Sequence, residues 1–377
     1  MLMHGFPEYL RDRGWEVHVV SAPGPSLDSL RKVVGIFTHA IEMTRDPSPL
    51  SDLKSLMAWI VLLRKIRPTV TSIGTPKAGL VGGLAAFLTR VPRRVYLLRG
   101  LRLETTHGFR RRIFTLIEKL SIFVAHDVLS VSPSLRQRTI DLRLVKPEKI
   151  VVLGAGSSNG VDTEEYSPAN VSTQVIAKLG ANLGLAKDVP VIGFVGRLTI
   201  DKGLIVLSEA REILTEASID HQLLLVGGID DGQSESILTK VKLAGRPATI
   251  TGHVADPRPY YHLMDLLCLP TFREGFPNVV LEAAASGIPT VTTNATGAVD
   301  SVINGQSGIV VAVGSSSALA NGIAEILSDS NLRERMGTAA REHVVTKYDR
   351  SDVWHRIETF YRAADTPSQL NRHEVEG

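Results

Sequence analysis

Two glutamates eight residues apart, Glu274 and Glu282, are well placed in this 377-residue chain to hold an extended ligand. Glu274 follows an apolar run that is expected to form a strand, and ligands bind beyond such strand ends in open α/β sheets. Glu282 lies about one turn into the helix expected next. A carboxylate that accepts hydrogen bonds from two hydroxyls suits a sugar or a ribose diol. The structural alternative makes Glu274 an acid stabilised by the helix dipole and Glu282 a solvated helix residue.

The segment between the two glutamates predicts an anion site. A glycine directly after Glu274 permits a tight turn, and a proline suits the first turn of a helix. Backbone amides at a helix start have no partner within the helix, so they can hold a phosphate. The residues expected to line this site are Gly275, Phe276, Pro277, Asn278 and Val279.

A second cluster combines a glycine with two cations. A strand is expected to end at Gly196, Arg197 and Lys202 lie five residues apart, and Gly203 opens a helix. Glycine allows a ligand to approach the backbone closely, and the two cations can neutralise the charge that grows on a departing diphosphate. The alternative is a surface turn with two solvated cations. The segment matches neither the Walker pattern nor the three-glycine dinucleotide fingerprint, which disfavours a nicotinamide dehydrogenase.

Short apolar runs that could carry these loops alternate with helical stretches along the chain. In the first half the runs lie at residues 16–21, 69–73, 94–98, 128–131 and 149–153. In the second half they lie at residues 191–195, 223–226, 248–251, 266–269, 290–293 and 308–311. Strands that alternate with helices predict parallel sheets covered on both faces, and the length allows two such domains.

The predicted boundary between the domains follows a glycine-rich loop. Residues 1–155 are expected to form the first domain, 156–188 a linker and 189–349 the second domain. Polar residues 366–377 are expected to form a frayed tail.

Charge is distributed unevenly between the two halves. Residues 1–150 carry a net charge of +12 and the remainder −9, which gives +3 overall. A basic first half favours an anionic partner. Three consecutive arginines, Arg110 to Arg112, open a segment whose apolar residues recur at helical spacing. Such a helix can lie on anionic lipid, although a solvated face on a core helix has the same pattern.

The cysteine count and the lengths of the apolar runs limit which kinds of site and of membrane attachment the chain can have. The single cysteine, Cys268, cannot form an intrachain disulfide or a cysteine zinc cluster, and its apolar neighbours predict a buried structural thiol. The sequence has no apolar run of the roughly 18 residues that a spanning helix needs and shows no signal peptide. We therefore expect a cytoplasmic protein, attached peripherally to the inner membrane face.

The glycine-linked cations and the paired glutamates resemble glycosyltransferase family 4, the retaining GT-B enzymes. The resemblance covers almost the whole chain: residues 159–162 are similar to the interdomain loop, residues 252–254 to the loop beside the nucleotide base, and a helix at about 350–365 to the segment that crosses back to the first domain. It implies two Rossmann-like domains that face a central cleft, with the acceptor on the first and the donor on the second.

Carried over to this sequence, the resemblance implies a role for each site residue. Arg197 and Lys202 would bind the donor diphosphate, and Glu274 would hold hydroxyls of the transferred sugar. Glu282 would hold the ribose hydroxyls. The loop of Gly275 to Val279 would lie near the sugar and phosphate, and the backbone around His253 and Val254 would border the base.

The resemblance also implies the reaction: front-face displacement from a nucleotide sugar, expected to be the uridine diphosphate form, with the leaving phosphate assisting deprotonation of the acceptor. No metal and no other cofactor are expected, since Asp230-Asp231 is predicted to be a turn and no Asp-x-Asp loop is evident. No nucleic-acid partner is expected.

Two segments, residues 75–80 and 99–104, resemble a bacterial branch that builds capsular, exopolysaccharide or lipid-linked glycans. Many relatives carry a histidine where this chain has Arg99. Arg99 and Arg102 are expected at the acceptor side of the cleft, where Arg99 could bind a phosphate or an acceptor acid, or pair structurally.

One departure concerns the start of the chain. The family opens with a strand and a glycine-rich loop, whereas residues 1–13 are expected to form the helix that follows them. The first strand of the N-terminal domain is therefore expected to be missing. Two alternatives remain at this point: a GT-B sugar-nucleotide 2-epimerase, and a truncated, non-catalytic GT-B binding protein.

Overall fold

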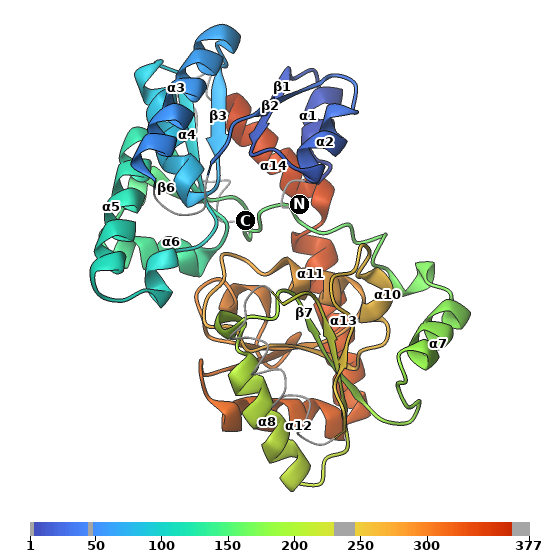
Figure 1. Ribbon diagram of the computed structural model, residues 1–377. Helices are drawn as coiled ribbons and strands as arrows, with labels where there is room; N and C mark the ends of the chain where they lie inside the picture. The colour runs from blue at the N-terminus through green and yellow to red at the C-terminus, as the bar shows by residue number, and fades with distance from the viewer. Residues whose placement is uncertain (1–3, 44–47, 230–245, 364–377) are drawn as a thin grey trace. The chain divides into compact units, whose positions relative to one another are not determined.

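The computed structural model describes residues 4–43, 48–229 and 246–363, which form two compact units (Figure 1). Unit 1 ends at Asn159 and takes up the chain again at Ser351, and unit 2 runs from Gly160 to Arg350. Of the predicted linker at residues 156–188, residues 160–188 lie within unit 2. The predicted turn at Asp230-Asp231 and the predicted tail at 366–377 lie outside the described residues.

Unit 2 contains a parallel sheet of six strands in the order β12-β11-β10-β7-β8-β9. The strands are β7 (Val191–Val195), β8 (Gln222–Val226), β9 (Thr249–Ile250), β10 (Leu266–Leu269), β11 (Thr290–Thr293) and β12 (Gly308–Val311). The chain builds outward from β7 in one direction and from β10 in the other. The junction of β7 and β10 is therefore the topological switch point, where ligands of such sheets bind.

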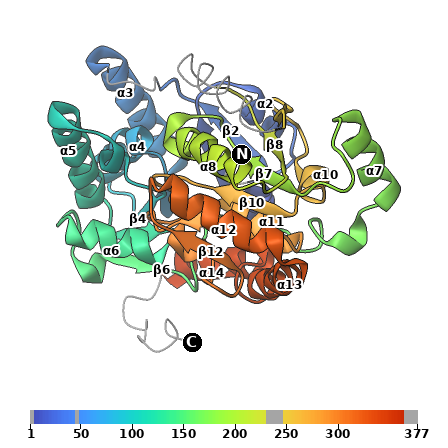
Figure 2. The same cartoon turned by 90° about the horizontal axis from the view of Figure 1, so that it is seen from below.

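Helices cover the sheet of unit 2. They are α7 (Thr173–Asn182), α8 (Leu204–Glu216), α10 (Arg258–Tyr261), α11 (Asn278–Ala285), α12 (Ser316–Ser328) and α13 (Ser330–Lys347), with short 3₁₀ turns η3 (Pro168–Asn170), η4 (Ile200–Lys202) and η5 (Val299–Ser301). Figure 2 shows α8 beside α12, and α11 packs on α13. Every residue of β7, β8, β10 and β11 is buried, as expected of a parallel sheet covered on both faces.

Unit 1 contains two separate parallel sheets. One pairs β1 (Val17–Ser21) with β2 (Ile36–Ala40). The other has the order β3-β4-β5-β6, formed by β3 (Val70–Ile73), β4 (Arg93–Leu98), β5 (Asp127–Ser130) and β6 (Ile150–Val152). The strand β2 was not predicted, because Thr38 and His39 interrupt its apolar residues and only Ile36 is buried.

The helices of unit 1 are α1 (Phe6–Asp12), α2 (Pro25–Arg31), α3 (Pro49–Ile66), α4 (Pro76–Leu88), α5 (Gly108–Val124), α6 (Pro133–Asp141) and α14 (Arg350–Arg362), with 3₁₀ turns η1 (Arg102–Thr105) and η2 (Pro147–Lys149). The last helix joins unit 1 through polar and aromatic contacts. Tyr361 donates a hydrogen bond to Ser72 Oγ at 2.6 Å, and the Trp354 ring lies 5.9 Å from that of Phe6. Among the described residues, no helix combines the length and the apolar character needed to cross a membrane.

Candidate functional site

The loops that follow β7 and β10 meet at the switch point of unit 2. Lys202, in η4, forms an ion pair with Glu274, in the loop after β10. Their side chains are only 18% and 15% exposed, so the pair is largely screened from water. The two residues lie 72 positions apart, and they meet because β7 and β10 are neighbours in the sheet.

Asp201 ties the same two loops together. Its Oδ1 accepts a hydrogen bond from Thr199 Oγ1 at 2.6 Å, and its Oδ2 lies 3.4 Å from Nη2 of Arg273. Its backbone carbonyl accepts from the amide of Phe272 at 3.0 Å. Sequence reasoning did not assign Asp201 a role, and its place between the two cations is the signal that could have drawn attention to it.

Glycines allow the strand ends to come close together. Gly203, at the start of α8, has a φ of 85°, and a Cβ there would lie 2.0 Å from the carbonyl oxygen of Pro270. Gly227, after β8, has a φ of 151°, and its Cβ would lie 1.8 Å from the carbonyl oxygen of Gly196. Gly227 also forms an isolated bridge with Gly252.

Through these contacts, the loop that holds His253 and Val254 begins beside the end of β7. His253 is exposed and Val254 is half-buried. Arg197 is exposed at the same strand end. The structure thus brings the predicted base-side loop and the predicted phosphate-binding cations to one edge of the sheet.

The turn at Glu274 and Gly275 is held by a segment that sequence reasoning missed. The amide of Glu274 donates to the carbonyl of Thr296 at 2.9 Å. Gly297 has a φ of 77°, and a Cβ there would lie 2.3 Å from the carbonyl oxygen of Gly275. A side chain at position 297 would therefore push against the turn that presents Glu274.

The helix α11 starts directly after this turn. Pro277 precedes the helix as its N-cap, and Asn278 and Val279 are its first residues. Phe276 is buried, with its ring 5.2 Å from that of Tyr348. Among the described residues, Asn278 Oδ1 is buried without a hydrogen-bond partner, so it can accept a hydrogen bond from a ligand.

Glu282 lies in α11 and is not a solvated helix residue. Its Oε2 accepts a hydrogen bond from the Tyr261 hydroxyl at 2.6 Å. Burial raises the pKa of the Glu282 carboxyl, and the hydrogen bond from Tyr261 acts in the opposite direction. The Tyr166 ring packs edge-on against Tyr261 at 5.8 Å. The structural alternative for Glu282 is therefore wrong.

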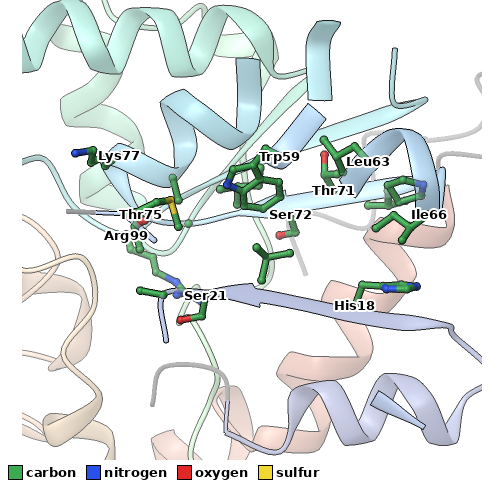
Figure 3. Close-up of a pocket in the computed structure, with 18 of the residues that line it drawn as sticks. His18, Ser21, Trp59, Leu63, Ile66, Thr71, Ser72, Thr75, Lys77 and Arg99 are labelled. Atoms are coloured by element: carbon green, nitrogen blue, oxygen red, sulfur yellow. The ribbon is translucent and has the colours of Figure 1, made fainter. Parts of the chain in front are cut away.

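In unit 1, Arg99 and Arg102 line a cavity of about 600 Å³ (Figure 3). Arg99 is half-buried, and burial lowers the pKa of its guanidinium. The Arg102 guanidinium lies 4.8 Å from the centre of the Phe114 ring. The structure thus brings both predicted acceptor-side arginines to one cavity.

Comparison with known proteins assigns the family. Residues 4–156 match the glycosyl transferase 4-like domain, and residues 176–343 match the glycosyl transferases of group 1. The capsular polysaccharide biosynthesis glycosyltransferase CapM of Staphylococcus aureus is 39% identical over 361 residues, which cover 96% of this chain and 93% of that protein. The chain belongs to the group 1 glycosyltransferases.

Two further proteins are similar over most of this glycosyltransferase. The UDP-Gal:alpha-D-GlcNAc-diphosphoundecaprenol alpha-1,3-galactosyltransferase of Escherichia coli is 27% identical over 86% of this chain and 83% of its own. The crystal structure of Anabaena HepE in complex with UDP-glucose has a TM-score of 0.77 at 22% identity, over 95% of this chain and 94% of that chain. The predicted family and the predicted GT-B fold are confirmed, and these relatives do not support the epimerase or the non-catalytic alternative.

Metal ligands are not grouped in the described part of this glycosyltransferase, where no three His, Cys, Asp or Glu side chains come together. Cys268 is buried in β10, and burial raises the pKa of its thiol. The groups that gather at the switch point are thus two cations, two glutamates and the start of α11.

Proposed function

We propose that this glycosyltransferase moves a hexosyl or N-acetylhexosaminyl group from a UDP-linked sugar to a glycan or polyprenyl-linked acceptor in surface polysaccharide synthesis. The observation that carries the proposal is the ion pair of Lys202 and Glu274 at the switch point. The pair brings together a cation and a carboxylate, which are the groups proposed to bind the diphosphate and the sugar hydroxyls. The names of the capsular and undecaprenol-linked relatives support the class of acceptor.

A bound donor would separate the ion pair, because Lys202 and Glu274 would each bind a different part of the donor. Lys202 and Arg197 would contact the diphosphate, together with the backbone amides at the start of α11. Glu274 would turn to hydroxyls of the sugar. Glu282, held by Tyr261, would accept hydrogen bonds from the ribose diol.

The proposed reaction retains the configuration of the transferred sugar. The bond from the anomeric carbon to the phosphate oxygen breaks, and the acceptor oxygen bonds to that carbon from the same face. The acceptor proton passes to an oxygen of the leaving phosphate. The positive charges of Arg197 and Lys202 stabilise the negative charge that develops there, so that no metal ion is needed.

A thermal-shift experiment tests the donor site. UDP and a panel of UDP-sugars are added to the wild type, to Glu274→Gln and to Lys202→Met, with the exposed Glu209→Gln as a matched control. Ligand binding raises the melting temperature by mass action. We expect the best UDP-sugar to stabilise the wild type and the control more than UDP does. In Glu274→Gln this increment should vanish while UDP still binds, and Lys202→Met should respond weakly to both.

Two results would contradict the assignment: no stabilisation of the wild type by any nucleotide sugar, or a full sugar increment in Glu274→Gln. Product analysis completes the test. Nuclear magnetic resonance should show the donor's anomeric configuration in the product, and transfer should continue in excess chelator. Inversion of the anomeric configuration, or loss of transfer in chelator, would refute the proposed mechanism. Neither result would contradict the proposed donor site.

The acceptor is proposed to reach unit 1 from an anionic membrane surface on the cytoplasmic side. Arg110, Arg111, Arg112 and Lys119 are exposed along α5. The same helix exposes 76% of Phe109, 59% of Leu116 and 71% of Phe123. A helix that exposes both large apolar side chains and several cations suits the headgroup region of anionic lipid.

A further inference from the structure

A second ion pair lies beside that of Lys202 and Glu274. Nη2 of Arg273 lies 3.4 Å from Oδ2 of Asp201. Asp201 directly precedes Lys202 in the loop after β7. Arg273 directly precedes Glu274 in the loop after β10. The two loops thus present opposite charges in opposite order, and each carboxylate is paired with a cation of the other loop.

Asp201 is fixed by further contacts within and between the loops. Its Oδ1 accepts a hydrogen bond from Thr199 Oγ1 at 2.6 Å. Its carbonyl oxygen accepts from the amide of Phe272 at 3.0 Å and from Oγ1 of the buried Thr271 at 3.3 Å. An isolated ion pair at the surface contributes little to stability. This pair differs because it belongs to a network that joins the two loops through backbone and side-chain groups.

Binding of a donor would affect the two ion pairs differently. Lys202 is proposed to bind the diphosphate and Glu274 the sugar hydroxyls, so the pair that they form would open. Asp201 and Arg273 have no proposed contact with the donor, so their pair can stay closed. It would then join the two loops while the donor is bound, when the Lys202–Glu274 pair no longer does.

We propose that the ion pair of Asp201 and Arg273 keeps the two loops at the spacing that a bound sugar diphosphate needs. Both are positioning residues in this proposal, which rests on the proposed function. Misplacement of a substrate-holding group by about 1 Å can cost about a hundredfold in rate. The donor-free protein should depend on the pair much less, because the ion pair of Lys202 and Glu274 joins the loops there as well.

Removal of one charge at a time tests the pair. Asp201→Asn keeps an acceptor for Thr199 but loses its charge, and Arg273→Gln removes the opposite charge. A second ion pair of unit 2 supplies matched controls, since Nη2 of Arg333 lies 3.4 Å from Oδ1 of Asp265. The four side chains are between 26% and 31% exposed. Asp265 precedes β10, so the control pair lies at the opposite edge of the sheet.

The expected effect appears only when a sugar donor is bound. We expect kcat/KM for the preferred UDP-sugar to fall by about tenfold in Asp201→Asn and in Arg273→Gln. The affinity for UDP alone should stay close to that of the wild type, because UDP carries no sugar for Glu274 to hold. The donor-free melting temperature should change by no more than about 2 °C.

Two further variants separate a paired role from two independent ones. The double variant Asp201→Asn with Arg273→Gln should also lose about tenfold in kcat/KM, because residues that act as one pair are not additive. Arg273→Lys should retain most of the activity, because it keeps a positive charge facing Asp201. The control variants Asp265→Asn and Arg333→Gln should retain the wild-type kcat/KM.

Several results would overturn the proposal. They are an unchanged kcat/KM in both single variants, a loss of about a hundredfold in the double variant, and equal losses in the control variants. A fall in the donor-free melting temperature that accompanies the loss of activity would make the pair merely structural. If the wild type transfers sugar and the variants do so equally well, this inference alone fails. A wild type that transfers no sugar would overturn the proposed function and this inference with it.

Discussion

The hydroxyl of Tyr261 donates a hydrogen bond to Glu282 Oε2 at 2.6 Å. Both residues belong to unit 2, Tyr261 at the end of α10 and Glu282 in the middle of α11. Tyr261 is fully buried, and its ring packs edge-on against Tyr166. This hydrogen bond restricts the rotamer of Glu282 before any ligand binds, which would lower the entropic cost of the ribose contact proposed for it.

Removal of this hydroxyl should weaken nucleotide binding. In Tyr261→Phe the ring packing remains, but Glu282 loses the 2.6 Å hydrogen bond to its Oε2 and is held less firmly. We expect a loss of about 1 kcal/mol in the free energy of unfolding and a several-fold rise in the KM for the nucleotide sugar, with kcat little changed. Urea unfolding and initial-rate kinetics measure the two effects.

Tyr260→Phe is the control for this change, since it removes a hydroxyl from the preceding residue of the same helix. It should leave KM unchanged. If Tyr261→Phe lowered stability but left KM at the wild-type value, Tyr261 would be a core residue without a positioning role.

Substitution of Gly297 is expected to lower transfer activity, because this residue packs against the turn that presents Glu274. Gly297→Ala would place a Cβ 2.3 Å from the carbonyl oxygen of Gly275, at a φ of 77°. The turn that presents Glu274 must then shift. Since misplacement of a substrate-holding group by about 1 Å can cost about a hundredfold in rate, we expect kcat/KM to fall by at least about tenfold.

Gly305→Ala is a matched control for the backbone strain. Gly305 has the same φ of 77°, but nothing lies within 4 Å of the Cβ position. Gly305→Ala should lose about 1 kcal/mol of stability because alanine is forced into the left-handed region, and Gly297→Ala should lose more because its Cβ also meets a carbonyl oxygen. Only Gly297→Ala should lose activity, and equal activity losses would show that strain alone is responsible.

The sequence predicted the strands of unit 2 and the residue types at their ends. The cations after β7 and the glutamates after β10 could be identified from the sequence, because glycine, proline and charged residues mark such loops locally. The ion pair of Lys202 with Glu274 could not be predicted from the sequence, since it depends on the order of strands in the sheet. Likewise, Gly297 looks like an ordinary turn residue until its distance from Gly275 is known.

Unit 1 shows the same division between local and long-range information. Residue patterns could not reveal that the strands of unit 1 form two sheets with a cavity between them. The strand β2 was missed because Thr38 and His39 interrupt its apolar residues, and its Phe37 is 50% exposed.

Stability should depend on pH through a buried glutamate in unit 1. Glu118, 4% exposed in α5, accepts a hydrogen bond from the Tyr96 hydroxyl at 2.8 Å, and burial raises the pKa of its carboxyl to about 7. The native state therefore keeps a proton that the unfolded chain, with an ordinary glutamate pKa of about 4.3, releases. The free energy of unfolding should fall by about 3 kcal/mol as pH rises from about 4 to 7, and level off above.

Glu118→Gln isolates this contribution, because the amide keeps an acceptor for Tyr96 and does not titrate. The difference in unfolding free energy between wild type and Glu118→Gln should shift by about 3 kcal/mol across this range, measured by urea unfolding at a series of pH values. Exposed Glu148→Gln should give a curve parallel to the wild type. Parallel curves for Glu118→Gln would show that this carboxyl is ionised in the native state.

Binding to anionic vesicles should depend on the charge of α5 rather than on net charge. Each cation near an anionic surface contributes about 1 kcal/mol, so reversal of two should weaken binding by at least about thirtyfold. Arg111→Glu with Arg112→Glu makes this change on α5, and Arg335→Glu with Lys347→Glu makes the same change in net charge on α13 of unit 2. In co-sedimentation at low salt, the wild type and the α13 variant should bind and the α5 variant should not.

Binding should weaken as salt shortens the Debye length to about 10 Å at 0.1 M. Equal losses of vesicle binding in both variants would show that net charge alone controls binding. A wild type that stays in the supernatant would refute the proposed attachment to membranes.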